Sequence, residues 1–363
     1  MKLFPSIEKA YARDRQRAAD AQRLAQFIAF APAIFQVSRL MVKWGILGML
    51  VDARDGMTAG EVANRAGISL YAAKILLEAS LSAGTVKVNP ETERFTASKA
   101  GWFLLTDPSA RANLDFNHDV NYEGFFRLDD SLREGRPAGL EHVGSWKTIY
   151  EGLSALPKEV QDSWFGFDHF YSDVSFPQAL EVVFSLRPRR IMDVGGNTGR
   201  WALRCVSHDP GVEVTVVDLP QQIALLKDHV KGKEGAERIK TWPADMLDAA
   251  STLPEGFDVI WMSQFLDCFS EEQIVSILRK AATVMSPHTR LCIMETFWDR
   301  QQFETASLCL TLTSVYFTAL ANGNSKMYLA TDFERLVREA GLEVESVSDG
   351  LGWGHSIMIC KKN

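Results

Sequence analysis

The sequence predicts a mainly α-helical N-terminal domain followed by an α/β domain with a doubly wound, mostly parallel sheet. Three observations lead to this prediction. The first third of the chain has the order helix, turn, helix, β-hairpin; from Arg190 onward short apolar runs alternate with amphipathic stretches; and a glycine-rich loop directly follows the first of those runs. At 363 residues the chain is long enough for two or more domains.

The N-terminal domain is predicted from its helix signals. Residues 1–30 and 33–50 have helical composition and periodicity. A capping box at 58–61 starts a further helix, and another runs over 69–83 before a β-hairpin over 85–96. This order of elements is typical of a winged helix.

Residues 107–180 form a helical stretch that is dense in aromatic side chains. The aromatic residues are Phe116, Tyr122, Phe125, Phe126, Trp146, Tyr150, Trp164, Phe165, Phe167, Phe170 and Tyr171. Such a set packs a core between two domains, lines a pocket for a flat, apolar substrate, or does both. Phe167, Phe170 and Tyr171 are the candidate substrate contacts.

The α/β domain is predicted from seven runs of strand-forming residues with helices between them. The strands are expected at 190–194, 213–218, 238–242, 257–262, 290–295, 343–348 and 355–360. The early runs are continuously apolar, which suits a parallel sheet covered on both faces. Ser270 and Thr331 are predicted as the N-caps of two of the intervening helices.

The loop from Asp193 to Gly199 follows the first strand and precedes a helix near Arg200. Its glycines, Gly195, Gly196 and Gly199, allow a sharp turn and a close approach of a ligand to the backbone. In a doubly wound sheet this loop lies at the carboxyl edge, where such folds bind their ligands. The sequence therefore predicts a Rossmann-like cofactor loop.

Two acidic residues help to identify the cofactor. Asp218 ends the next strand, where a carboxylate can accept hydrogen bonds from both hydroxyls of a ribose. The glycine spacing is G-G-x-x-G and not the G-x-G-x-x-G that positions a pyrophosphate. Asp193, two residues before the first glycine, suits the cationic amino group of an aminoacyl cofactor better than a phosphate. S-Adenosylmethionine has such a group and no phosphate, so it is the expected cofactor.

Taken together, five segments resemble the plant-type small-molecule O-methyltransferase family, which includes caffeate and acetylserotonin methyltransferases and bacterial tailoring enzymes. The segments are 193–199, 217–220, 244–246, 293–295 and 333–341. The resemblance covers nearly the whole chain. It implies a winged-helix dimerisation domain over 1–105, an aromatic-rich helical bridge over 106–180 that lines the substrate cleft, and a Rossmann-like methyltransferase domain over 181–363. It further implies a homodimer that methylates a small, aromatic or polycyclic acceptor, with O-methylation as the expected reaction.

The resemblance also implies roles for individual residues toward S-adenosylmethionine. The residues expected near its methionyl part and ribose are Asp193, Gly195, Gly196, Gly199, Asp218, Leu219, Ser263 and Gln264. Asp245 would meet the amino group of the adenine, and Met246 would pack on the adenine ring.

The family's catalytic base is a histidine just after the fourth strand, but this chain has Asp267 at that position. Glu295 matches the first of two glutamates that support the base. Met327 stands where the second glutamate would be, and we expect it at the substrate. A free aspartate titrates near 3.9, about 2.6 units below imidazole, so it is the weaker base unless burial raises its pKa.

Three explanations of Asp267 remain open. In the first, Asp267 is a buried base with a raised pKa that is coupled to Glu295. In the second, the acceptor is an amine, an acidic enol or a nucleophilic carbon that needs no strong base, and Asp267 orients it or binds a cation. In the third, the protein has lost methyl transfer. A Cys268 thiolate is disfavoured, because the neighbouring Asp267 raises the pKa of the thiol. His118, His169 and His355 could project into the cleft from other segments, but a place at the surface or in packing is the favoured expectation for each.

Other classes of function fit less well. A net charge of −7 argues against a nucleic-acid partner, and so does a helix over 69–83 whose only basic residue is Lys74. The glycine spacing argues against a dehydrogenase. We see no apolar stretch of about 18 residues for a membrane, no secretion signal, no metal-ligand cluster and no paired cysteines. We therefore expect a cytoplasmic enzyme that uses no metal.

Overall fold

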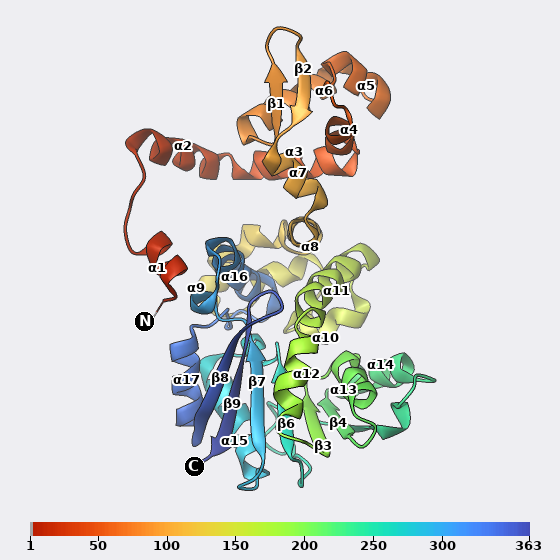
Figure 1. Cartoon of the computed structure of the whole chain (residues 1–363), viewed down its shortest axis with the longest axis vertical. Helices are drawn as coiled ribbons and strands as arrows, with labels where there is room; N and C mark the ends of the chain where they lie inside the picture. Colours follow the sequence, from red (N-terminus) through yellow and green to blue (C-terminus); the bar gives the residue numbers. More distant parts are fainter. Residues whose placement is uncertain (1–2) are drawn as a thin grey trace. The chain divides into compact units, whose positions relative to one another are not determined.

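The computed structural model describes residues 3–363, which divide into two compact units (Figure 1). One unit, here called the helical unit, is Asp14–Val120. The other, here called the α/β unit, combines the described residues 3–13 with Asn121–Asn363.

The helical unit consists of helices and one two-stranded antiparallel sheet. Its elements are α2 Ala18–Ala29, α3 Ala31–Lys43, α4 Ile46–Asp52, α5 Ala59–Ala66, α6 Leu70–Ala83, β1 Val86–Asn89, β2 Arg94–Ala97, α7 Lys99–Thr106 and α8 Pro108–Phe116. The predicted capping box is confirmed, because Glu61 donates its N–H to Thr58 Oγ1 and Thr58 donates its N–H to Glu61 Oε2. Leu47, Val62 and Leu77 are fully buried in its apolar core.

Two of the helices predicted for this part of the chain are wrong in extent. The predicted helix over 33–50 breaks between α3 and α4, because Gly45 has a φ of 70°, which interrupts the helical hydrogen bonds. The apolar periodicity continues across this break, so the pattern alone does not reveal it. The helix predicted over 1–30, whose residues 1 and 2 lie outside the described part, is instead two helices, α1 (Pro5–Tyr11) and α2.

No single helix within residues 3–363 is long and apolar enough to cross a membrane. Two consecutive pairs, α2 with α3 and α5 with α6, reach that length and composition only together, and they are bent by 72° and 118°.

The α/β unit contains a seven-stranded sheet in the described chain, in the order β5-β4-β3-β6-β7-β9-β8. The strands are β3 Arg190–Val194, β4 Glu213–Asp218, β5 Ile239–Pro243, β6 Val259–Ser263, β7 Arg290–Glu295, β8 Leu342–Leu351 and β9 His355–Lys362. Neighbouring strands are parallel except around β9, which runs antiparallel to both β7 and β8. The chain reverses direction across the sheet at β3, so the carboxyl ends of β4, β3 and β6 lie side by side at one edge.

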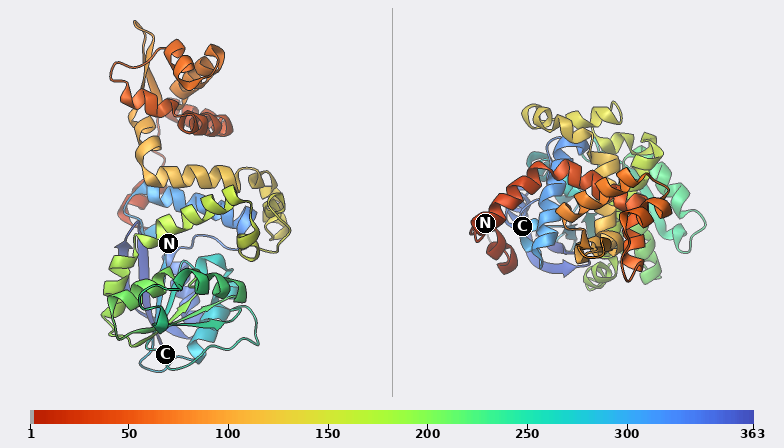
Figure 2. Two further views of the ribbon diagram at one scale, coloured as in Figure 1. Left: turned by 90° about the vertical axis from the view of Figure 1, so that its right-hand side faces the viewer. Right: turned by 90° about the horizontal axis from the view of Figure 1, so that it is seen from above.

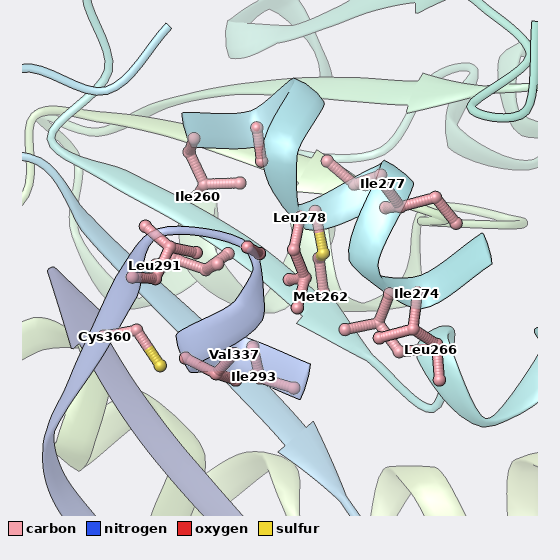
Figure 3. Close-up of a cluster of buried hydrophobic side chains, with 14 of the residues drawn as sticks. Ile260, Met262, Leu266, Ile274, Ile277, Leu278, Leu291, Ile293, Val337 and Cys360 are labelled. Carbon is pink, nitrogen blue, oxygen red and sulfur yellow. The ribbon is translucent and has the colours of Figure 1, made fainter. Parts of the chain in front are cut away.

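Helices cover both faces of this sheet, which explains its continuously apolar strands. The helices of the unit are α1, α9 Leu128–Glu134, α10 Ile149–Gly152, α11 Lys158–Asp173, α12 Phe176–Phe184, α13 Arg200–His208, α14 Pro220–Val230, α15 Glu271–Thr283, α16 Glu304–Tyr316 and α17 Ala330–Glu339. One core cluster joins α15 and α17 to one face of the sheet (Figure 3). The other joins α12, α13 and α14 to the opposite face, and these green helices lie in front of the sheet in the left view of Figure 2.

One predicted helix start in this unit is wrong. The helix expected to be capped by Thr331 is α17, which begins at Ala330 and has no side-chain cap of its own. Its first N–H group instead donates to Asp299 Oδ1 at 2.9 Å, from the 3₁₀ turn Trp298–Arg300, 31 residues earlier. A carboxylate that is distant in the sequence thus caps this helix, and the residues around the helix start do not indicate such a cap.

The amino-terminal helix α1 packs within the α/β unit. The N–H of Phe4 donates to the carbonyl of Asp299, and Ser6 Oγ donates to the carbonyl of Gln301. Tyr11 Oη bonds to Ser307 Oγ on α16, and the side chain of Ile7 is fully buried.

The core cluster in Figure 3 predicts a measurable loss of stability. Leu278 on α15 is fully buried against the sheet, so Leu278→Ala should lower the free energy of unfolding by about 3 kcal/mol through lost apolar burial and a residual cavity. Urea unfolding of the full chain, followed by circular dichroism, measures this change. Leu247→Ala, at a side chain that is 45% exposed, is the control and should cost less than about 1 kcal/mol. Equal costs for the two variants would contradict the assignment of the core.

Candidate active site

The loop after β3 is built from backbone conformations that favour glycine. Gly195 has a φ of 75° and donates its N–H to the carbonyl of Val217 at 2.8 Å. Gly199 has a φ of 77° and starts α13. A Cβ at Gly196 would lie 2.5 Å from Asp193 Oδ2, closer than packed atoms approach. The loop therefore keeps its shape only while these positions lack side chains.

Asp193 places a carboxyl group out of water at the end of β3. Its side chain is 2% exposed, and Oδ2 has no hydrogen-bond partner. Burial, with a contribution from the nearby Asp218, raises the pKa of Asp193 to about 8. A buried carboxyl oxygen that lacks a partner is suited to receive a donor or a cation from a ligand.

Asp218, at the end of β4, ties the loop to the neighbouring strand. Its Oδ2 accepts the N–H of Asn197 at 2.8 Å, and its Oδ1 accepts the N–H of Leu219 at 2.7 Å. Burial raises the pKa of Asp218 to about 6, although these two hydrogen bonds act in the opposite direction. The residues predicted from the sequence for the ribose thus lie directly beside the glycine loop.

Asp245 and Met246 follow β5, the next strand at this edge. Asp245 is exposed, and its Oδ1 accepts the N–H of Leu247 at 2.8 Å. Met246 is 6% exposed and joins the core cluster on the α15 side of the sheet. The carbonyl of Asp218 accepts the N–H of Ala244, so these residues are held next to the end of β4.

A cavity lies at the carboxyl edge of β3 and β6, and it brings several of the predicted residues together. Its lining consists of Asp168, His169, Ser172, Phe176, Asp193, Gly195, Gly196, Asn197, Thr198, Arg200, Trp201, Trp261, Ser263 and Gln264. Five of the residues predicted for the cofactor, from two separate loops, therefore share one wall. Gln264 has a φ of 45°, and its buried Oε1 has no hydrogen-bond partner. Like Asp193, it offers an unused polar atom.

The helix α11 supplies cavity residues that the sequence interpretation missed. Asp168, His169 and Ser172 line the cavity, so His169 takes the cleft position that the sequence interpretation names as the less favoured alternative. Arg200, the first residue of α13, forms an ion pair with Asp173 and a hydrogen bond with His169 Nδ1 at 3.0 Å. Burial, with the charge of Arg200 as a further cause, lowers the pKa of His169. In the sequence, the position of Arg200 directly after the glycine loop is the signal that could have indicated this contact.

Asp267 lies in a 3₁₀ turn over Leu266–Cys268, just beyond β6. It is 6% exposed, and burial raises its pKa to about 6. Glu295 ends β7 and is 2% exposed. Burial and the charge of Asp267 together raise the pKa of Glu295 well above its usual range.

Glu295 also fixes the turn that carries Asp267. Its Oε1 accepts the N–H groups of Phe265 and Leu266, at 3.1 and 2.9 Å, while Oε2 has no partner. Cys268 donates its thiol to Asp267 Oδ1 at 3.4 Å, and burial raises the pKa of that thiol well above its usual range. The two carboxyls therefore form a buried pair on a rigid support.

Two buried tyrosines respond to the charge of Asp267. Burial raises the pKa of both Tyr150 and Tyr316, and the negative charge of Asp267 contributes to both increases. Tyr316 on α16 also accepts a hydrogen bond from Trp164 Nε1 of α11 at 2.7 Å.

The predicted substrate contacts do not line the described cavity. Phe167 and Tyr171 contact each other with ring centroids 5.0 Å apart, and Phe170 stacks on Trp353 at 5.8 Å. Met327 is 7% exposed, and its Sδ accepts a hydrogen bond from Thr296 Oγ1 at 3.5 Å. Contact of these side chains with a substrate stays a prediction.

The raised pKa of Asp193 predicts a pH-dependent stability. The carboxyl keeps its proton up to about pH 8 in the folded protein and loses it near 3.9 in the unfolded chain, so rising pH across this window destabilises the folded state. Asp193→Asn cannot ionise, so its melting temperature relative to the wild type should increase steadily as the pH rises from about 5 to about 8. Thermal unfolding without ligand measures the difference. The exposed control Asp228→Asn should show none, and a pH-independent effect of Asp193→Asn would refute the raised pKa.

Comparison with known protein families assigns both parts of the chain. The O-methyltransferase domain family matches residues 160–343, just over half of the chain. The Dimerisation2-like domain family matches residues 22–95, within the helical unit.

Individual relatives and solved structures agree with this assignment. The chain is 24% identical to an L-tyrosine C(3)-methyltransferase of Streptomyces lavendulae, over 94% of this chain and 93% of that protein. It is 26% identical to a 3-amino-4-hydroxybenzoate 4-O-methyltransferase of Streptomyces cremeus, over 82% and 79%. The crystal structure of the S-adenosylmethionine-dependent methyltransferase SibL superposes with a TM-score of 0.70 and 26% identity, covering 93% of this chain and 98% of that one.

Human N-acetylserotonin methyltransferase, solved in complex with S-adenosylmethionine, shares the fold at a TM-score of 0.67 and 20% identity, covering 97% of this chain and 99% of that one. The chain therefore belongs to the O-methyltransferase family, as an S-adenosylmethionine-dependent methyltransferase with a Dimerisation2-like domain before its catalytic domain.

Proposed function

We propose that this enzyme methylates a hydroxyl group on a small aromatic or polycyclic acceptor, and that Asp267 takes the hydroxyl proton. The observation that carries the proposal is the buried carboxyl pair of Asp267 and Glu295 just beyond the end of β6. Asp267 occupies the position where the family has its catalytic histidine. Relatives named for hydroxylated aromatic substrates, such as 3-amino-4-hydroxybenzoate, support the class of acceptor.

The residues at the carboxyl edge fit S-adenosylmethionine. The unpartnered Asp193 Oδ2 suits the amino group of the methionyl part, and the missing side chain of Gly196 leaves room for it. We propose that Gly195, Gly199, Ser263 and Gln264 approach the same part, that Asp218 and Leu219 hold the ribose, and that Asp245 and Met246 hold the adenine. When bound, the cofactor supplies a methyl group on a sulfonium, which is reactive toward an aligned nucleophile.

Burial adapts Asp267 to the task of a base. Its pKa of about 6 lies close to that of an ordinary imidazole, so a carboxylate at neutral pH replaces much of the basicity lost with the histidine. With the cofactor bound to supply the methyl group, the Asp267 carboxylate would take the proton that the acceptor hydroxyl loses as its oxygen is methylated. Glu295 is the positioning residue, because it holds the turn through two backbone N–H groups.

C-methylation beside a phenolic hydroxyl is the second candidate. The L-tyrosine C(3)-methyltransferase, which aligns with 94% of this chain, is named for such a reaction. Transfer of the hydroxyl proton to Asp267 makes the neighbouring ring carbon more nucleophilic, so the same carboxyl serves either reaction. Mass spectrometry and NMR of the product distinguish a methyl ether from a methylated ring.

We further propose that the enzyme is a cytoplasmic homodimer that associates through the helical unit. The Dimerisation2-like match supports this, as do the apolar side chains of Leu24, Ile28 and Phe30, which are 43%, 65% and 63% exposed. The five cysteines are all free thiols, as expected in a reducing compartment. Two residues support the proposal that the aromatic segment 106–180 contributes the acceptor wall: Trp164 donates to Tyr316, and the charge of Asp267 contributes to the raised pKa of Tyr150.

The cofactor assignment predicts the effect of one methyl group in the loop. Gly196→Ala should weaken binding of S-adenosylhomocysteine by about tenfold to 100-fold, because overpacking against Asp193 Oδ2 costs about 1–3 kcal/mol. Isothermal titration calorimetry measures the affinity. The control Gly60→Ala, where a Cβ has room, should bind like the wild type, and NAD should give no heat. Wild-type protein that binds NAD but not S-adenosylhomocysteine would overturn the proposed function.

The assignment of the base predicts both a rate and a pH profile. With an acceptor found by screening hydroxylated aromatics for methyl transfer, Asp267→Asn and Asp267→Ala should lower kcat by about 100-fold to 10,000-fold. The wild-type rate should rise as the pH passes through about 6, since Asp267 must be ionised, and the variants should lose this rise. Asp228→Asn, at an exposed aspartate, is the matched control. A loss smaller than tenfold would show that Asp267 is not the base.

A further inference from the structure

Two polar contacts join α13 to α11 beside the cofactor cavity. Arg200 Nη1 donates to His169 Nδ1 at 3.0 Å, and Arg200 Nη2 forms an ion pair with Asp173. Arg200 and His169 both line the cavity, together with Asp193 and Gly196 of the glycine loop. A cation and an imidazole therefore share this cavity with the carboxyl group that we assign to the cofactor's amino group.

The contact with Arg200 determines which ring nitrogen of His169 carries a proton. A guanidinium group only donates hydrogen bonds, so Nδ1 is the acceptor. Burial, with the charge of Arg200 as a further cause, lowers the pKa of His169, so the ring is neutral near pH 7 and its proton is on Nε2. Nε2 is buried and has no hydrogen-bond partner. His169 thus presents an unused N–H donor.

Aromatic packing holds this imidazole in place. The ring of His169 stacks on that of Phe165, with centroids 5.6 Å apart and an angle of 30° between the planes. Phe165 meets Trp164 edge to face at 5.0 Å, and Trp164 Nε1 donates to Tyr316 Oη on α16. The donor is therefore carried by a ring that is packed on one side and hydrogen-bonded at Nδ1.

Arg200 also keeps donors that a ligand can use. A guanidinium group has five N–H donors, and the contacts with His169 and Asp173 engage only Nη1 and Nη2. The side chain lines the cavity and is 41% exposed, so a ligand can reach it. Because two protein partners already hold the guanidinium group, it loses little conformational freedom when an anion binds.

These donors match one particular group of the cofactor. S-Adenosylmethionine has a single anionic group, the carboxylate of its methionyl part, which is attached to the same carbon as the amino group. Asp193 Oδ2, which lacks a partner, suits that amino group and belongs to the same cavity. Hydrogen bonds between a guanidinium group and a carboxylate are charge-assisted and strong. The cavity thus offers an acceptor and two donors for the two ends of an amino acid.

We infer that the guanidinium group of Arg200 and the Nε2–H of His169 bind the carboxylate of the cofactor's methionyl part. The inference rests on the proposed function, because that function supplies the cofactor. It adds two residues, one from α13 and one from α11, to those that we propose for the glycine loop and for the loop after β6.

A pair of ligands that differ only in the carboxylate tests this without turnover. The ligands are S-adenosylhomocysteine and its decarboxylated analogue, which keeps the adenosine, the sulfur and the amino group. Calorimetry should show that the wild-type protein binds S-adenosylhomocysteine about tenfold to 100-fold more tightly than the analogue. Arg200→Met should remove most of this preference by weakening the binding of S-adenosylhomocysteine alone, and Arg200→Lys should retain part of it.

Variants of His169 test the second donor. His169→Phe keeps a ring to stack on Phe165 but removes the N–H, so it should lower the preference by about threefold to tenfold. His169→Gln, whose amide nitrogen can reach toward the position of Nε2, should retain part of that loss. Arg204→Met, at an exposed arginine on the same helix as Arg200, is the matched control and should leave the preference unchanged.

Three results would overturn the inference: a wild-type protein that does not distinguish the two ligands, a preference that survives intact in Arg200→Met, or an Arg200→Met variant that weakens both ligands equally. The last result would show that Arg200 only joins α13 to α11. An unchanged preference in His169→Phe would overturn the role of His169. Wild-type protein that binds neither ligand refutes the proposed function instead, so the two failures are distinguishable.

Discussion

The desolvation of carboxyl groups at the carboxyl edge of the sheet is the constraint on which the rest of the site depends. Parallel strands end together, so β3, β4 and β7 deliver Asp193, Asp218 and Glu295 to one region that helices screen from water. A buried carboxylate without a donor or a cation is costly. Each of these carboxyl groups therefore accepts hydrogen bonds from backbone N–H groups, stays protonated, or leaves an oxygen for a ligand to bind.

The three groups solve this problem differently, and the differences match their proposed roles. Asp218 uses both oxygens on the backbone N–H groups of neighbouring residues, which fixes the shape of the loop. Glu295 uses one oxygen in the same way and so supports the turn of Asp267. Asp193 leaves Oδ2 without a partner. The number of backbone donors that each carboxyl meets thus determines how much of it supports the backbone, and Asp218 combines this support with its proposed contact to the ribose.

The sequence alone was sufficient to predict those elements whose structure follows from the pattern of residues within them. The strands β3, β4 and β7 begin and end where their apolar runs do, because a strand covered on both faces must be apolar throughout. The glycine loop was equally clear, since its backbone conformations exclude side chains. Resemblance to a family located Asp267, but its burial and its pairing with Glu295 required the structure.

The features that were missed depend on contacts between distant segments. The apolar periodicity runs through Gly45, so nothing in the spacing signals that the helix breaks there. The start of α17 is set by Asp299, and the place of α11 at the cavity is set by Arg200. Asp168 illustrates the limit most clearly. It is one acid among aromatic neighbours in the sequence, and only the structure places it in the lining of the cavity.

The docking of α1 has a consequence for how the polypeptide matures. This helix is made before the helical unit, yet its partners, from Asp299 to Ser307, are made only after the helical unit and most of the sheet. During synthesis α1 must therefore stay undocked until these later segments have emerged from the ribosome. The helical unit is thereby an insertion with two chain connections. An expression fragment that starts at Asn121 would lack α1 and would expose to water the apolar surface that buries Ile7.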